Sequence, residues 1–142
     1  MSGTNEIAGG IFTIPKDKKF TVKIEYSIDK DGSLMVVNDV NRKSFKAEDI
    51  KVATATFLIP NWKEVNDLNE ASMVPANNGA SDTVFSFGRY KENILKKLLI
   101  DLKDGDNVTI DTTDEFIDSM DPRFAQSILN AYFMKMRSEE EA

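Results

Sequence analysis

The stretch FLIPNWKEVNDLNEAS, residues 57–72, marks the point where this chain changes from strand to helix. Pro60 lacks a backbone N–H, so it ends the strand that precedes it. Asn61 and Glu64 then have the N-cap to N3 spacing of a capping box, with Asn in place of Ser or Thr. The pattern predicts a helix that begins at Asn61 and ends near Ser72.

Three strands are predicted before this junction. Residues 51–59 (KVATATFLI) are rich in β-branched side chains, which favour strands. Further upstream, strict apolar and polar alternation from Phe20 to Ile28 predicts a half-buried strand. Asp31-Gly32 is a hairpin turn signal, and residues 33–37 supply a short return strand. The apolar face of the third strand, expected to meet the core, consists of Ala53, Ala55, Phe57 and Ile59.

Helices are predicted after the junction. Residues 73–83 (MVPANNGASDT) have the composition of a loop. A wide apolar stripe then predicts a second helix, which begins between Phe87 and Tyr90 and runs to about Lys103. Residues 108–110 are too few to assign, and they fit either an edge strand or an extended link.

Two more helices are predicted near the end of the chain. Thr112 and Glu115 have the spacing of a capping box, which indicates a short third helix. Asp121-Pro122 is a cap followed by a helix-starting proline. The last helix has a one-sided apolar stripe, which consists of Phe124, Ala125, Ile128, Leu129, Tyr132, Phe133 and Met136.

The fold class predicted from these elements is α+β. A small, mostly antiparallel sheet, made of the N-terminal hairpin and the third strand, is packed by three to four C-terminal helices. The apolar strand face needs a cover, and the helices are the only candidates for it. We expect a single domain over residues 1–142. Its parts are a mobile N-terminal segment (1–15), a β-rich part (18–59), a helical part (60–137) and an acidic tail (138–142).

Composition excludes several classes of function. The 142 residues include no cysteine and no histidine, so disulfides, thiolate metal sites and the Ser-His-Asp triad are excluded. The 18 basic and 24 acidic residues give a net charge of −6, a sign that repels nucleic acid and anionic membranes. No segment has the roughly 20 apolar residues of a membrane span, and the N-terminus does not resemble a secretory signal. The expected location is therefore the cytoplasm of the cell that makes the protein.

The acidic stretch from Asp104 to Asp121 was tested as a calcium or magnesium site. With Asp104 as position 1, Asp106 and Glu115 fit the EF-hand loop, but Val108 and Thr109 stand where the loop needs a ligand and a glycine. We therefore expect no metal and no cofactor, and we interpret these acids as favourable charges at helix N-termini. No catalytic residue is predicted.

Some apolar residues are candidates for binding a partner. Trp62, the only tryptophan, could anchor a partner, although a lone tryptophan at a strand–helix junction usually belongs to the core. Tyr132, Phe133, Met134 and Met136, with Phe124, are more than one core stripe requires. Met134 lies off that stripe, and exposed methionine and aromatic side chains suit adaptable peptide binding. A buried helix face is the alternative.

Residues 57–136 resemble bacteriophage tail assembly chaperones. The resemblance is carried by PNWKEVNDLNEAS, by RYKENILKKLLIDL after a variable loop, and by the pair of helices that ends in DPRFAQSILNAY. It implies a non-enzymatic protein of the host cytoplasm that binds other phage tail proteins, the tape measure or tail tube protein, and that could form homo-oligomers. The binding surface it implies is the helical half, with Trp62, Leu68, Tyr90, Phe133 and Met134.

Three alternatives stay open. A structural virion subunit of the tail, neck or baseplate would use the hairpin and the third strand to extend a neighbour's sheet. An acidic inhibitor would bind a basic host protein through its carboxylates. An enzyme would have to work through paired carboxylates, around which no apolar pocket can be inferred from the sequence.

Overall fold

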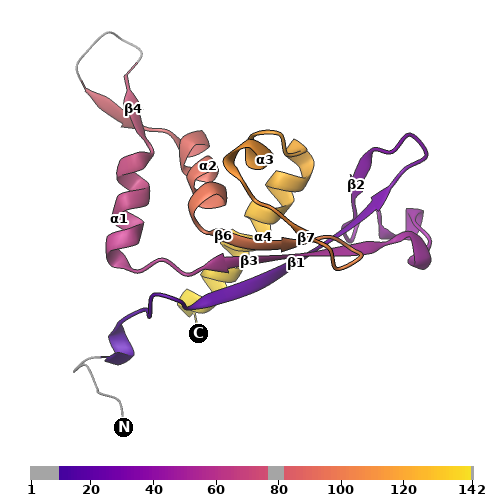
Figure 1. The fold of residues 1–142 in the computed structure, drawn as a ribbon, viewed down its shortest axis with the longest axis horizontal. Helices are drawn as coiled ribbons and strands as arrows, with labels where there is room; N and C mark the ends of the chain where they lie inside the picture. Colours follow the sequence, from indigo (N-terminus) through magenta and orange to yellow (C-terminus); the bar gives the residue numbers. More distant parts are fainter. Residues whose placement is uncertain (1–9, 77–81, 142) are drawn as a thin grey trace.

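The computed structural model of this chain describes residues 10–76 and 82–141. At its centre is an antiparallel five-stranded sheet in the order β2-β1-β3-β6-β7 (Figure 1). The strands are β1 (Lys19–Ile28), β2 (Leu34–Val36), β3 (Lys51–Leu58), β6 (Leu99–Lys103) and β7 (Thr109–Ile110). The predicted α+β fold is confirmed. Because β3 is the middle strand and is paired on both sides, it offers no edge to a neighbouring sheet, and that part of the virion-subunit hypothesis is wrong.

The alternation in the sequence sets which face of the sheet is buried. Phe20 pairs with Phe57 and Val22 with Ala55, and all four side chains are buried on the same face. The other face carries polar side chains, and the hydroxyls of Thr21 and Thr56 lie 3.0 Å apart across it. The apolar face predicted for the third strand is confirmed.

Four helices accompany the sheet: α1 (Trp62–Ala71), α2 (Phe87–Lys97), α3 (Asp114–Asp118) and α4 (Pro122–Glu141). The long helix α4 passes behind the sheet in Figure 1 and contacts β1 and β2. Helices α1 and α2 pack against each other at one end of the sheet, and α2 also contacts α3 and β6. The last helix continues to Glu141, beyond the start of the acidic tail predicted at residue 138.

Strand β6 corrects the sequence prediction, which continued the second helix to Lys103. Helix α2 ends at Lys97, and the residues after it form a strand beside β3. The register shifts between Thr56 and Phe57, so that Leu99 and Leu102 pair with Phe57 and Ala55 on the buried face. This irregularity separates two inward side chains by three residues, the spacing of a helix, which explains the wrong prediction.

The helix starts are close to those predicted. At α1, the Asn61 side chain accepts a hydrogen bond from the Glu64 N–H and Glu64 accepts one from the Asn61 N–H, so the capping box is confirmed. At α3, the cap is Thr113 and not Thr112: its hydroxyl accepts from the Phe116 N–H at 3.1 Å. Thr112 has the glutamate that a capping box requires three residues later, whereas Phe116 stands at that position after Thr113, so the capping-box pattern selected the wrong threonine.

The segment predicted as a loop contains a small hairpin. Strands β4 (Met73–Pro75) and β5 (Thr83–Phe85) pair with each other and project from the body of the molecule (Figure 1). Their connection at residues 77–81 lies outside the described residues. Met73, Val84 and Phe85 are exposed on this hairpin. With β6 and β7, the part of the chain predicted as helical therefore contributes four short strands.

The turn between β6 and β7 is closed by a tyrosine. The Gly105 N–H donates to the Tyr26 hydroxyl at 2.9 Å, and the Asp104 carboxylate accepts from the N–H groups of Asp106 and Val108. A Cβ at residue 105 would lie 2.6 Å from the Lys51 Cβ, so only glycine fits there.

Three short 3-10 turns complete the described elements: η1 (Gly10–Phe12), η2 (Arg42–Ser44) and η3 (Ala47–Asp49). Residues 1–9, most of the segment predicted to be mobile, lie outside the described residues, but Ile14 packs against the core. No described helix is long and apolar enough to cross a bilayer.

Candidate functional site

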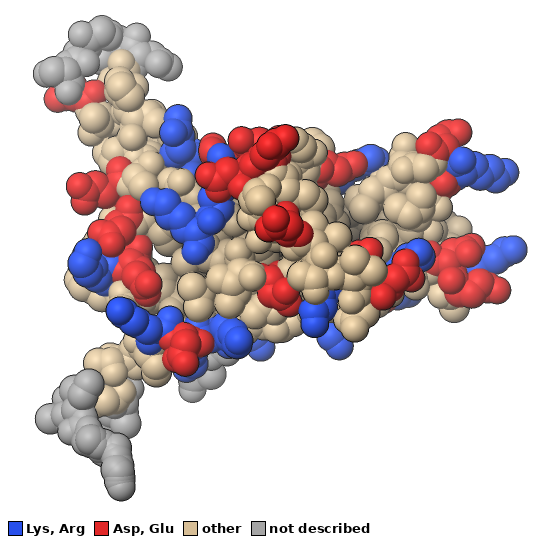
Figure 2. Space-filling view, in the orientation of Figure 1, with Lys and Arg blue, Asp and Glu red and all other residues tan. Residues whose placement is uncertain are grey.

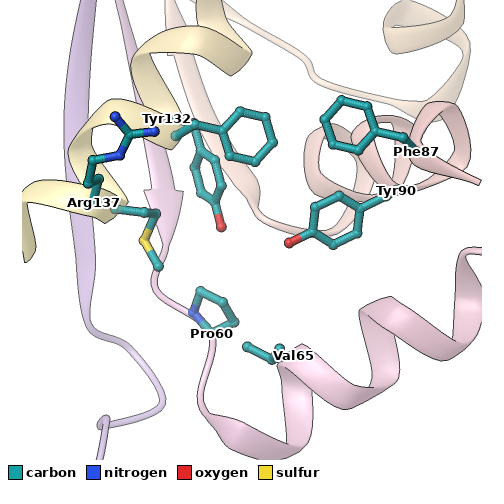
Figure 3. Close-up of a pocket in the computed structure, with 8 residues that line it drawn as sticks. Pro60, Val65, Phe87, Tyr90, Tyr132 and Arg137 are labelled. Carbon is teal, nitrogen blue, oxygen red and sulfur yellow. The ribbon is translucent and has the colours of Figure 1, made fainter. Parts of the chain in front are cut away.

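A cavity of about 460 Å³ lies where α1, α2 and α4 meet beyond the end of β3 (Figure 3). Its volume is within the range of pockets that hold small ligands or single large side chains. Its walls are mostly apolar or aromatic, and one lining residue is a cation. The lining residues are Pro60, Val65, Phe87, Tyr90, Tyr132, Phe133, Met136 and Arg137.

Three aromatic rings form one wall of this cavity. Phe87, Tyr90 and Phe133 stack in pairs, with ring centroids 6.2 to 6.5 Å apart and planes within 26° of parallel. Phe85 of the hairpin adds a fourth ring, 5.5 Å from Tyr90. We call Phe85, Phe87, Tyr90 and Phe133 the aromatic cluster. It joins the exposed hairpin to the cavity as one continuous apolar surface.

Local sequence sets where these rings lie. Ser86 caps α2 by accepting a hydrogen bond from the Arg89 N–H at 3.1 Å, which places Phe87 in the first turn. Tyr90 follows three residues later, so the two rings share a helix face. On α4, Phe133 turns toward the cluster, whereas its neighbour Tyr132 packs against the core.

Tyr132 contributes a polar group at the floor of the cavity. Only 3% of this residue is exposed, and its ring lies 4.9 Å from Phe57 and 5.7 Å from Phe20. In Figure 3 its hydroxyl points into the cavity. No described residue hydrogen-bonds to this hydroxyl. Because no described side-chain oxygen is both fully buried and unpaired, it is open to the cavity. Buried hydroxyls normally have a hydrogen-bond partner, so solvent or a ligand must supply one at this hydroxyl.

The Tyr90 hydroxyl also faces the cavity in Figure 3. Burial raises the pKa of Tyr90, and burial together with the nearby Tyr90 raises the pKa of Tyr132. Both phenols are therefore protonated at neutral pH, and each has an O–H to donate. The cavity thus combines an apolar interior with two hydrogen-bond donors.

The charge around the cavity is positive, although the chain as a whole is acidic. Arg137 lines the cavity, and the Lys91 amine lies 5.2 Å from the centre of the Phe87 ring, a cation–π contact. None of the eight lining residues is acidic. Figure 2 shows basic side chains gathered over α2, between acidic groups over α1 and α3.

The structure brings together two of the five residues predicted to bind a partner. Tyr90 and Phe133 stack on each other in the cavity wall. Trp62 is 80% exposed, so its interpretation as a core residue is wrong. It lies three residues before Val65 and on the same side of α1, but Trp62 itself is not among the residues that line the cavity.

The other two predicted residues lie elsewhere. Leu68 is 3% exposed and belongs to the hydrophobic core, so a partner could not reach its side chain. Met134 is 69% exposed, as expected for a residue off the apolar stripe. It lines a different surface groove, with Thr21 and Lys23, away from the cavity. The helical surface implied by the resemblance is therefore not one continuous patch.

Sequence reasoning missed Phe87, Pro60, Val65 and Arg137 as parts of the site. A signal for Phe87 was present: in FSFGRY (85–90), Phe87 and Tyr90 are separated by three residues next to a capping serine. No local signal marks Pro60 or Arg137, because each joins the site only when α1 and α4 pack beside α2.

The acidic stretch has structural roles. Asp104 closes a turn, Asp114 and Glu115 lie in the first turn of α3, and Asp121 accepts from the Arg123 N–H at the start of α4. The Arg123 guanidinium lowers the pKa of Asp121. In residues 10–76 and 82–141, no three acidic side chains are grouped so that they could hold a metal ion.

We compared the chain with protein-family models, with curated proteins and with solved structures, and none of the three comparisons found a match.

Proposed function

We propose that this protein is a non-enzymatic binding protein that captures a large apolar side chain of a partner protein in the cavity between α1, α2 and α4. The observation that carries the proposal is the aromatic cluster, whose rings line the cavity and continue onto the exposed hairpin. Phe87 in the cavity wall and Trp62 at the start of α1 are both exposed, and aromatic side chains are enriched at protein interfaces.

We further propose that the biological role is assembly of a bacteriophage tail, with a tape measure or tail tube protein as the partner. This part of the proposal rests on the resemblance of residues 57–136 to tail assembly chaperones. An exposed aromatic surface suits a protein that shields apolar segments of another chain before they assemble. Such a chaperone would act in the host cytoplasm and would be absent from finished particles.

A second candidate function is that of a structural virion subunit. It is favoured by the β4–β5 hairpin, which pairs only with itself among the described strands and exposes Met73, Val84 and Phe85. A two-stranded hairpin is marginally stable alone, so contact with a neighbouring subunit would stabilise it.

Affinity purification from the native producing cells tests these proposals. The tagged wild type is compared with Phe87→Ser, which removes an exposed ring of the cluster, and with Val40→Ser, which changes a still more exposed apolar residue in the connection between β2 and β3. We expect a tail protein to be enriched with wild type and Val40→Ser and to be lost with Phe87→Ser.

Equal enrichment with all three proteins would contradict the binding site. Recovery of the wild type in purified particles would contradict the chaperone role and support the virion subunit. Enrichment of basic host proteins in place of tail proteins would support the inhibitor that the sequence left open.

A further inference from the structure

The polar groups of the cavity indicate which kind of partner segment it accepts. We infer that the occupant is an acidic segment of the partner, in which a large apolar side chain enters the cavity and a neighbouring Asp or Glu carboxylate meets Arg137 and the tyrosine hydroxyls. The inference rests on the proposed function, because it assumes that the cavity binds a protein.

The hydrogen-bonding groups support an occupant that accepts hydrogen bonds. The hydroxyls of Tyr90 and Tyr132 enter the cavity from two different helices (Figure 3). Tyr132 is almost completely buried, and its hydroxyl has no described protein partner, so solvent or a ligand must satisfy it. A wholly apolar occupant would displace that solvent and leave a buried O–H unpaired, which is unfavourable.

The charges select an anionic acceptor over a neutral one. Arg137 on α4 lines the cavity, Lys91 on α2 lies over the ring of the lining residue Phe87, and no lining residue is acidic. Neither cation has an ion-pair partner among the described side chains, whereas Lys96 on the same helix as Lys91 is paired with both Glu92 and Asp118. A guanidinium is suited to pairing with a carboxylate.

The overall charge of −6 does not oppose this selection. At physiological ionic strength, charges more than about 8 Å apart are largely screened in solvent. Among the eight residues that line the cavity, Arg137 carries the charge. Distant carboxylates reduce the rate of encounter more than the strength of the bound contact.

Binding of short synthetic peptides tests the inference. The probes are fluorescein-labelled, carry a C-terminal amide, and differ only in two flanking residues: GESFLSEG, GQSFLSQG and GKSFLSKG. We expect the glutamate peptide to bind the wild type about tenfold more tightly than the glutamine peptide, the difference typical of a charge-assisted hydrogen bond. We expect the lysine peptide to bind most weakly.

Three variants show which residues produce the preference for the glutamate peptide over the glutamine peptide. Arg137→Gln should reduce the ratio of glutamate to glutamine affinity to about one, because it removes the cation that lines the cavity. Tyr132→Phe should weaken the glutamate peptide while it keeps the ring in place. Val40→Ser, far from the cavity, should bind all three peptides like the wild type.

Several outcomes would overturn the inference. Equal affinity for the glutamate and glutamine peptides, with loss of both in Phe87→Ser, would show that the cavity takes an apolar side chain without regard to charge; the proposed function would then stand alone. No saturable binding of the glutamate peptide would also overturn it, while the purification from native cells judges the proposed function separately. If sedimentation shows a dimer that Phe87→Ser dissociates, the occupant is a second copy of this chain.

Discussion

Two tyrosines show the difference between the two ends of this molecule. Tyr26 and Tyr132 are both buried, and both belong to elements that form the core. The Tyr26 hydroxyl accepts from the Gly105 N–H and thereby closes the β6–β7 turn. The Tyr132 hydroxyl faces a cavity between helices. One end of the sheet is therefore internally satisfied, and the other keeps a polar group available. We assign stability to the first end and binding to the second.

Removing the Phe57 ring, which lies beneath the cavity, should have the largest effect on stability. Phe57 is fully buried near the end of the central strand β3 and contacts both Phe20 and Tyr132. Phe57→Ala should lower the free energy of unfolding by about 4 kcal/mol, because it removes buried surface and leaves a void. Urea denaturation followed by circular dichroism measures this loss. A loss under about 1 kcal/mol would mean that the region is loosely packed.

A methyl group added at Gly105, in the β6–β7 turn that Tyr26 closes, should have the next largest effect on stability. Gly105→Ala places a Cβ 2.6 Å from the Lys51 Cβ and 2.9 Å from the Tyr26 hydroxyl, which should cost about 2 kcal/mol of stability. The matched control is Gly88→Ala on α2, where the nearest atom is 3.8 Å away. Alanine is the better helix former, so the control should be stabilised by about 0.5 kcal/mol. Equal effects in thermal denaturation would contradict the close approach at Gly105.

The comparison of the two tyrosines is tested directly by removing each hydroxyl. Tyr26→Phe leaves the Gly105 N–H without its partner and should cost about 1 kcal/mol. Tyr132→Phe removes a hydroxyl with no described protein partner, so stability should change by less than about 0.5 kcal/mol while peptide binding weakens. The urea midpoint of each variant, compared with that of the wild type, measures the loss of stability. A larger loss in Tyr132→Phe would show that this hydroxyl serves the fold.

The smallest expected effect is a dependence on alkaline pH. Burial raises the pKa of Tyr132 in the folded protein above its unfolded value of about 10. The folded state then holds the proton more tightly, so this contribution is complete below pH about 10 and is lost as the pH rises through the folded pKa. The urea midpoint of the wild type should therefore decrease as the pH rises above about 10. The midpoint of Tyr132→Phe should decrease less steeply with pH. Identical slopes for the two proteins would contradict the raised pKa of Tyr132. Lys96, whose pKa is raised by Asp118 and Glu92, contributes in the same direction in both proteins.

Most of the fold followed from local patterns. Alternation along residues 20–28 and 51–59 identified both long strands and their buried faces, because side chains on a strand point to opposite sides in turn. The capping box at Asn61 located the start of α1 to the residue. The sequence was misleading at β6, where a register shift gives a strand the three-residue spacing of a helix.

The candidate site could be predicted only in part. Phe133 was recognised as a surplus aromatic residue and Tyr90 was implied by the resemblance, but nothing in the sequence showed that their rings stack on each other across 43 positions. Trp62 was a candidate both for a partner surface and for the core, and its exposure, which depends on where α1 docks, excludes the core. Leu68 and Trp62 both lie on α1, yet one is buried and the other exposed.

By itself, the sequence determined the types of most elements, the buried face of the sheet and the absence of cysteine and histidine chemistry. These are local or compositional properties, set by backbone geometry and by side-chain type at each position. Only the tertiary structure decided that Pro60, Phe87, Tyr132 and Arg137 surround one cavity, because that depends on how three helices pack at the end of a sheet. It also decided that the Tyr26 hydroxyl is paired and the Tyr132 hydroxyl is open, since a hydrogen bond requires a partner brought from a distant part of the chain.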